Sequence, residues 1–340
     1  MPTLSLGDTN CIVQLSEATG DTLWSIEGGG RENYVAAPRC SSSSSSSTGA
    51  TPPLVLMPKV CHTVHDTLRE LWSDQWTLVD ALRGSVVRRG PLEFDAIITS
   101  LAFSACGGFF ATGDCHGHVK LWCTETGALR CCMEHTALAP AARRLSLSIS
   151  SDGARMAGTS QDGRDAVVIW DTGTGDIVHE MTALLTRLAG IDACAFSPTE
   201  PHCLAIVSSL TPLPSHCAGR SHCEGQLWDV GGQTQMLDDN GYDHAFEGRA
   251  FLRFSPDGTK MVTYGPRPCQ GTADVLIVCA VRAATLLRLG TGMRVVLDAT
   301  FSGSGEAVFT IASSMCDVWR VSDGAHSKRI DMQQQITHMA

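Results

Sequence analysis

The sequence has no long apolar stretch and few charged residues. No run in its 340 residues approaches the ~18 consecutive apolar residues of a membrane-spanning helix, and no basic start followed by an apolar run marks a signal peptide. Charged residues make up 18% and hydrophobic residues 43%, a composition typical of chains that fold around a substantial core. We therefore expect a soluble protein of the cytoplasm that does not contact a membrane.

Positive charge is scarce as well. The chain carries 25 Lys and Arg against 35 Asp and Glu, a formal net charge of -10. Because binding to DNA or RNA phosphates depends on clustered basic residues, we expect no nucleic acid partner.

Linear catalytic motifs are also missing. There is no Gly-x-Ser-x-Gly elbow, no Walker loop, and no Gly-x-Gly-x-x-Gly at the start of a βαβ unit. These absences favour a protein that is not an enzyme and that requires no cofactor.

The 15 cysteines are an odd number without the spacing of a disulfide framework. Reduced thiols that act as small hydrophobic residues explain them best, which agrees with a cytosolic location. One segment, 209–224, contains the pairs His216-Cys217 and His222-Cys223. Neighbouring His and Cys are difficult to aim at one ion. We therefore expect no metal there. The alternative is a zinc site, and metal analysis of the purified protein would distinguish the two.

The chain does contain a repeat. Five related phrases recur, usually at intervals of roughly 47 residues, and each alternates apolar residues before a serine. They are Leu101-Ala102-Phe103-Ser104, Leu147-Ser148-Ile149-Ser150, Cys194-Ala195-Phe196-Ser197, Leu252-Arg253-Phe254-Ser255 and Ala299-Thr300-Phe301-Ser302. Glycine-containing turns and short apolar or β-branched segments follow, as expected for hairpins. A period of this size predicts the four-stranded blades of a β-propeller.

The predicted third strands carry the most specific pattern, an apolar-x-apolar-Trp-Asp motif that closes a repeat. They are Val119–Trp122, Val167–Asp171, Gln226–Asp229 and Asp317–Trp319. Over most of residues 97–330 this pattern resembles the WD40 repeat family. A weaker copy lies at Leu68–Ser73, with Leu54–Met57 as an earlier strand and Trp76–Val79 as the outer strand of its blade.

The two ends of the chain are predicted to form one composite blade. Cys11–Leu15 and Ala18–Trp24 resemble its last two strands, and Gln335–Met339 supplies an inner strand, while no clear second strand is visible. We therefore predict a single all-β domain over 1–340, a β-propeller of about seven four-stranded blades with the composite blade incomplete. A Ser/Gly-rich loop (27–51) and an inserted loop (209–224) lie within it. The missing strand suggests either a truncated sequence or a piece of a larger protein.

The resemblance assigns structural roles to the marked residues. In the family, an Asp in the turn before the third strand and the Trp within that strand join one hydrogen-bond network, and Asp162 with Trp170 matches this placement. The pair Asp114 and Trp122 matches less well, because His116 stands nearer to the position of the acid. The residues expected to hold the blades together are Trp72, Trp122, Asp162, Trp170, Asp171, Trp228, Asp229 and Trp319.

The resemblance also implies a function. Propellers of this family present a loop rim and the mouth of the central channel to proteins or peptides, so we expect a non-catalytic interaction scaffold or adaptor. The alternatives are a sensor or regulatory domain of a larger protein and a propeller enzyme. Candidate partner-binding residues lie in the loops between second and third strands: Asp114, His116, Gln161, Arg164, His216 and Arg220. The partner and the oligomeric state stay open.

Overall fold

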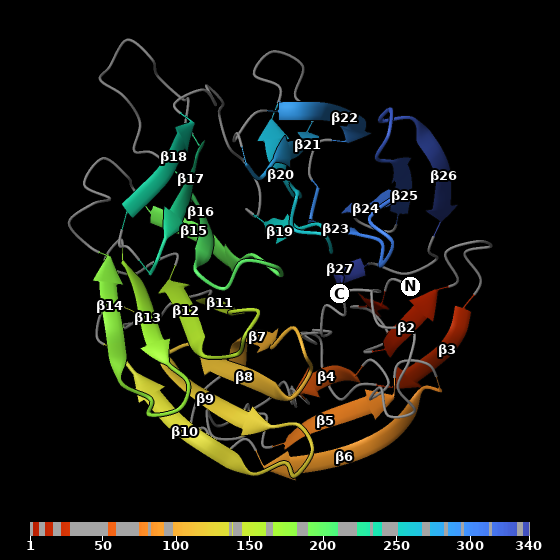
Figure 1. Cartoon of the computed structure of the whole chain (residues 1–340). Helices are drawn as coiled ribbons and strands as arrows, with labels where there is room; N and C mark the ends of the chain where they lie inside the picture. The colour runs from red at the N-terminus through yellow and green to blue at the C-terminus, as the bar shows by residue number, and fades with distance from the viewer. Residues whose placement is uncertain are drawn as a thin grey trace, which may run out of the picture.

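The computed structural model of the chain is built from antiparallel sheets around a common centre (Figure 1). It describes residues 3–6, 11–15, 22–27, 54–58, 75–80, 83–91, 98–135, 138, 145–160, 166–181, 190–209, 223–231, 234–239, 251–266, 273–281, 285–293, 296–312, 315–331 and 336–339. Within these ranges the strands form six four-stranded sheets and one three-stranded sheet. The prediction of an all-β propeller is confirmed.

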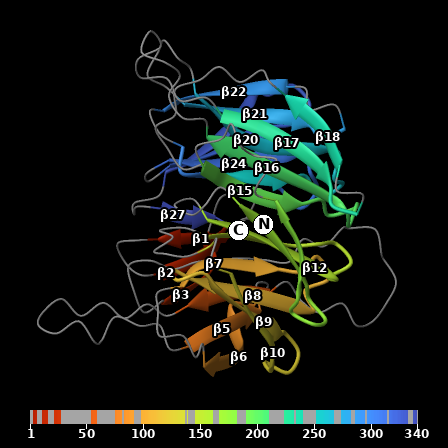
Figure 2. The same cartoon turned by 90° about the vertical axis from the view of Figure 1, so that its left-hand side faces the viewer.

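Five of the sheets follow chain order. They are β7–β10 (Ile98–Phe103, Phe109–Asp114, His118–Cys123, Leu129–Glu134), β11–β14 (Leu145–Ile149, Arg155–Ser160, Val167–Asp171, Ile177–Met181), β15–β18 (Gly190–Phe196, Cys203–Ser209, Cys223–Asp229, Thr234–Asp239), β19–β22 (Leu252–Phe254, Lys260–Pro266, Ala273–Cys279, Thr285–Met293) and β23–β26 (Asp298–Phe301, Ala307–Ala312, Met315–Arg320, His326–Asp331). The first strand of each sheet contacts the first strand of the next, so β7, β11, β15, β19 and β23 line the centre of the ring. Figure 2 shows the same stack of sheets from the side.

The composite sheet joins the two ends of the chain. The C-terminal strand β27 (Ile336–Met339) pairs with β1 (Thr3–Leu6), which pairs in turn with β2 (Cys11–Leu15), and β3 (Thr22–Glu27) is outermost. The predicted inner strand is confirmed, but the prediction that the second strand is absent is wrong. A four-residue strand carries too little periodicity to be recognised in the sequence, and its pairing on both sides defines it.

The three-stranded sheet corrects a second prediction. It contains β4 (Leu54–Pro58), β5 (Gln75–Asp80) and β6 (Ser85–Pro91) in that order. Trp76–Val79 thus belongs to a central strand of this sheet and is not its outer strand, while Trp72 lies outside the described residues. The turn after β5 explains the assignment, because the Gly84 N–H donates to the Asp80 carbonyl just as the Gly175 N–H donates to the Asp171 carbonyl.

Five interfaces between neighbouring sheets are separate apolar clusters in the described part of the chain. Between β7–β10 and β11–β14, for example, Leu121 of one sheet meets Leu147 and Trp170 of the other. The next interface buries the opposite face of β11–β14, with Val167 and Ile169 against the following sheet. Three further clusters connect β4–β6 to β7–β10, β15–β18 to β19–β22, and β19–β22 to β23–β26. Both faces of a sheet are therefore covered only when it has neighbours on both sides.

Four of the five serines of the repeated phrase close the first hairpin of their blade in the same way. In the β11–β12 turn the Ser150 Oγ accepts the Arg155 N–H (2.9 Å) and the Gly153 N–H donates to the Ser150 carbonyl (2.9 Å). Gly153 has φ 72°, a left-handed conformation that favours glycine. The same arrangement recurs at Ser104, Ser255 and Ser302, with the glycines at positive φ that the sequence predicts.

The blade assignment predicts a large destabilisation for Trp170→Ala. The side chain is fully buried, and a methyl group at Gly158 would lie only 2.8 Å from its ring. Truncation should lower the free energy of unfolding by about 3–5 kcal/mol, because a cavity is left between two sheets. Urea unfolding measures this cost. Val281→Ala, at a position 73% exposed, is the control and should be nearly neutral; equal midpoints for both variants would contradict the assignment.

Candidate functional site

The antiparallel strands give the ring two different rims. One rim, the turn rim, carries the connections between first and second strands: 104–108, 150–154, 197–202, 255–259 and 302–306. The other, the loop rim, carries the connections between second and third strands: 115–117, 161–166, 210–222, 267–272 and 313–314. Connections on the turn rim are nearly equal in length, whereas those on the loop rim differ several-fold. The blades therefore differ from one another in connection length mainly on the loop rim.

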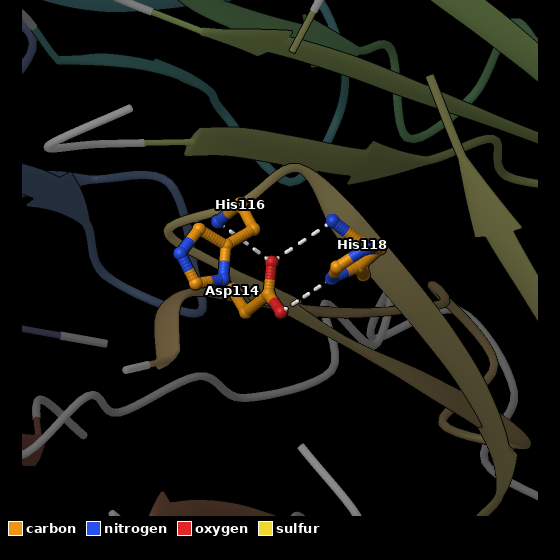
Figure 3. A group of neighbouring side chains, drawn as sticks. All are labelled: Asp114, His116 and His118. Atoms are coloured by element: carbon orange, nitrogen blue, oxygen red, sulfur yellow. Dashed lines mark hydrogen bonds and ion pairs between the residues drawn. The ribbon is translucent and has the colours of Figure 1, made fainter. Parts of the chain in front are cut away.

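The β8–β9 turn on the loop rim is the one whose side chains the structure describes throughout (Figure 3). Asp114, 1% exposed, ends β8, and its Oδ1 accepts the N–H groups of His116 and His118, each at 2.9 Å. Its Oδ2 accepts a hydrogen bond from the Nδ1–H of His118 (2.8 Å). The carboxylate therefore fixes the turn and the direction of one imidazole.

Gly117 makes this turn possible. Its φ is 86°, and its N–H donates to the Asp114 carbonyl (3.2 Å). A Cβ atom at Gly117 would lie 2.9 Å from the carbonyl carbon of Leu138, so the following segment packs directly over the turn. As a result, the exposed rings of His116 and His118 share one side of a tightly held loop, at a ring-centroid distance of 6.1 Å.

Two of the motif tryptophans use the same hydrogen bond. The indole N–H of Trp122 donates to Thr112 Oγ1, and that of Trp319 donates to Thr310 Oγ1, both at 2.9 Å. The register is equivalent, because each threonine lies two residues beyond the residue that pairs with the Trp. In both blades the buried indole therefore finds its one required partner on the neighbouring strand.

The other two motif tryptophans are also buried but have different surroundings. In the blade of Trp170, the position that corresponds to the threonine is occupied by Gly158, two residues beyond the residue that pairs with the Trp. The Trp170 ring packs against Gly158. Trp228 donates to Gln226 Oε1 (3.1 Å) on its own strand. Apolar burial is thus common to all four, while the hydrogen bond is not.

The aspartates that follow the motif tryptophans cap turns. Asp171 Oδ1 accepts the N–H groups of Gly173 (2.8 Å) and Thr174 (2.9 Å), and these hydrogen bonds lower the pKa of the exposed carboxyl. Asp229 Oδ1 accepts the Gly231 N–H (2.9 Å). These residues act locally, at the turn between third and fourth strands.

The remaining predicted positions divide in two. Asp114 and His116 both belong to the β8–β9 turn. The side chain that holds the turn is Asp114 and not His116, because the Asp114 carboxylate accepts the backbone N–H groups. Asp114 is also too buried to meet a partner. The inserted loop is shorter than predicted at its ends, since Ser209 belongs to β16 and Cys223 and Glu224 belong to β17. Outside the described residues lie Trp72, Gln161, Asp162, Arg164, His216 and Arg220, and almost all of the 27–51 loop.

A buried acid that sequence reasoning missed lies on β25. Asp317 is fully buried, and its carboxylate accepts hydrogen bonds from Arg329 Nε (2.7 Å), Arg329 Nη2 (2.9 Å) and His326 Nε2 (3.0 Å). Burial raises the pKa of this carboxyl, but the hydrogen bonds from Arg329 and His326 outweigh it, so the pKa is lower than usual. Asp317 stands at the variable position of the motif, where Lys120 stands in β9, so the sequence gives no signal that this acid is buried.

One side-chain contact on the turn rim joins two neighbouring blades. Arg155 Nη1 lies 2.5 Å from His202 Nδ1 of the next sheet, beside the turn that Ser150 closes.

Thr112→Val tests the indole hydrogen bond. The exchange keeps the shape of the side chain but removes the acceptor of the buried Trp122 N–H, so we expect a loss of about 1–3 kcal/mol in the free energy of unfolding. In a Trp122→Phe background, which has no indole N–H, the same exchange should cost much less. Denaturant unfolding of the four proteins measures the coupling, and an equal cost in both backgrounds would refute it.

Asp317 predicts a pH dependence of stability. Because its pKa is lower in the folded than in the unfolded state, the ionised carboxylate stabilises the fold above the usual carboxyl pKa near 4. This contribution is lost as the pH falls from there through the lower folded-state pKa. Urea unfolding between neutral pH and about pH 2 should show Asp317→Asn to be less stable at neutral pH and less sensitive to acid. The exposed Asp176→Asn control should keep the wild-type profile; an unchanged profile for Asp317→Asn would contradict the expectation.

Comparisons with known proteins identify one repeat. Residues 88–123 match the family model described as WD domain, G-beta repeat (WD40). The matched segment begins in the outer strand β6 of one sheet and ends with β9 of the next, so one sequence repeat connects two blades. A search of curated proteins finds no match. The chain therefore contains one matched WD40 repeat, and the ring of antiparallel sheets around it is consistent with a WD40-like repeat protein.

Proposed function

We propose that this chain is a non-catalytic scaffold or adaptor that binds proteins or peptides through its loop rim and the mouth of its channel. WD40 repeats in general serve as protein-interaction scaffolds. The observation that supports the proposal here is the difference between the two rims. Four of the five turn-rim connections repeat one short serine-glycine hairpin, while the loop rim carries connections of very different lengths.

The difference in length suggests that the two rims have different roles. Connections of nearly constant length, as on the turn rim, are expected where a connection only closes a hairpin. Loops that differ in length and composition on a rigid scaffold are where binding residues concentrate. Partner contacts are therefore assigned to the loop rim, with His116, Gln161, Arg164, His216 and Arg220 as candidates.

The kind of partner follows from charge and chemistry. The net charge of -10 disfavours nucleic acid, since phosphate binding depends on a basic surface. None of the described residues forms a helix long and apolar enough to span a bilayer. Nine cysteines whose side chains the structure describes are free thiols, which supports a cytoplasmic, reducing location.

Charge reversal on each rim tests the proposal. Arg164→Glu with Arg220→Glu alters two loop-rim connections, and Lys260→Glu with Arg320→Glu alters two turn-rim positions by the same change in charge. Tagged proteins are used to capture partners from cell lysate, and bound proteins are quantified by mass spectrometry. We expect the loop-rim variant to lose at least one specific partner by about tenfold and the turn-rim variant to retain it.

Two results would contradict the proposal. One is equal loss of every partner in both variants, which indicates non-specific electrostatic capture. The other is the absence of any protein enriched over a tag-only control. Unfolding midpoints of both variants must match the wild type, so that loss of binding reports the surface and not the fold.

A further inference from the structure

We propose that Asp114, His116 and His118 bind a divalent transition-metal ion of the zinc class on the loop rim. Each residue offers one ligand atom, and the three atoms lie within 4.8 Å of one another. Among the residues that the structure describes, this is the one group of three or more His, Cys, Asp or Glu side chains with that property. This inference has its own test, and a negative result in that test would leave the proposed scaffold function standing.

The turn holds the three residues in place before any ion arrives. Asp114 is fixed by two backbone N–H groups, and Gly117 allows the turn to pack on Leu138. The five-residue segment therefore cannot open without breaking these contacts. A site built on such a hairpin has little ordering entropy to lose when an ion binds.

The ligand set points to the class of ion. Two imidazoles and one carboxylate suit Zn²⁺ and its neighbours, whereas Mg²⁺ and Ca²⁺ prefer oxygen ligands. Ligand atoms of a tetrahedral zinc site lie ~2.0–2.2 Å from the ion, closer together than these three. His118 is already held beside Asp114 by its Nδ1–H bond, so it is the exposed His116 ring that must rotate toward the carboxylate to complete the set (Figure 3). Three protein ligands leave a coordination position open toward solvent.

Charge near the turn favours a cation. The Glu134 carboxylate on β10 lies 3.8 Å from His118 Nε2. Together with Asp114 it places two acidic groups beside the imidazoles. No Lys or Arg side chain forms an ion pair with Asp114 in the described part of the chain, where its contacts are the turn N–H groups and His118.

The competing interpretation is a purely structural turn. The pair Asp114 and His118 needs no ion, since their hydrogen bond already satisfies both groups. A similar pair, Asp317 and His326, occurs in another blade without a second histidine in its group. His116 is what distinguishes the two sites, because within the described part of the chain its ring contacts the His118 ring and takes part in no side-chain hydrogen bond. It therefore carries the test.

The test compares wild type, His116→Gln and His326→Gln. Exposed thiols are first blocked with N-ethylmaleimide and metals are removed by a chelator, because free cysteines and the 216–223 segment also attract zinc. Titration with Zn²⁺ against a chromophoric competitor then counts equivalents. We expect wild type and His326→Gln to bind one equivalent more than His116→Gln. Zn²⁺ should also raise the unfolding midpoint of wild type and of His326→Gln but not that of His116→Gln, and Mg²⁺ should raise the midpoint of none of them.

Without metal, His116→Gln should unfold at the wild-type midpoint, since its ring supports no structural hydrogen bond. The proposal is overturned if wild type and His116→Gln bind the same number of equivalents, or if His326→Gln loses an equivalent as well. A midpoint shift with Zn²⁺ that is equal in all three proteins would likewise assign the ion to other residues.

Discussion

Four consecutive sheets of this chain, from β7–β10 to β19–β22, are apolar on both faces, and the rest of the structure follows from the need to cover them. In β11–β14 the side chains of Met156, Val168 and Trp170 face one neighbouring sheet, while Ala157 and Ile169 face the other. A two-layer sandwich would leave one of these faces in water. A ring of sheets covers both, and it leaves no terminal sheet when the first and last segments of the chain pair, as β1 and β27 do.

Most of this arrangement could be predicted, because its signals are periodic. The alternation of apolar residues, the Ser-Gly turns and the Trp-containing third strands recur with a period long enough to indicate blades. Two details could not. β1 is too short to show alternation, and the Leu71-Trp72 pair imitates the third-strand motif next to β5, where Trp76 is the buried residue. Strand pairing, which is a property of the backbone, decides such cases.

The site was less predictable than the fold for a physical reason. Which of Asp114 and His116 organises the β8–β9 turn depends on the direction of their side chains, and that direction is set by Gly117 at positive φ and by Leu138 packing above it. The sequence shows the acid and the two histidines but not which groups face one another. The buried Asp317 is similar, since its partners Arg329 and His326 lie on the next strand.

The tryptophan positions show why the repeats can diverge. Burial of a large aromatic side chain between two sheets contributes several kcal/mol, whereas a hydrogen bond contributes about one. Trp122 and Trp319 keep a threonine partner, Trp228 uses a glutamine on its own strand, and β21 has Val278 in place of the aromatic ring. An apolar side chain is buried at this position in each of these four blades, so the hydrogen bond is free to vary. The apolar volume at the interfaces therefore holds the ring together, while the connections of the loop rim differ in length from blade to blade.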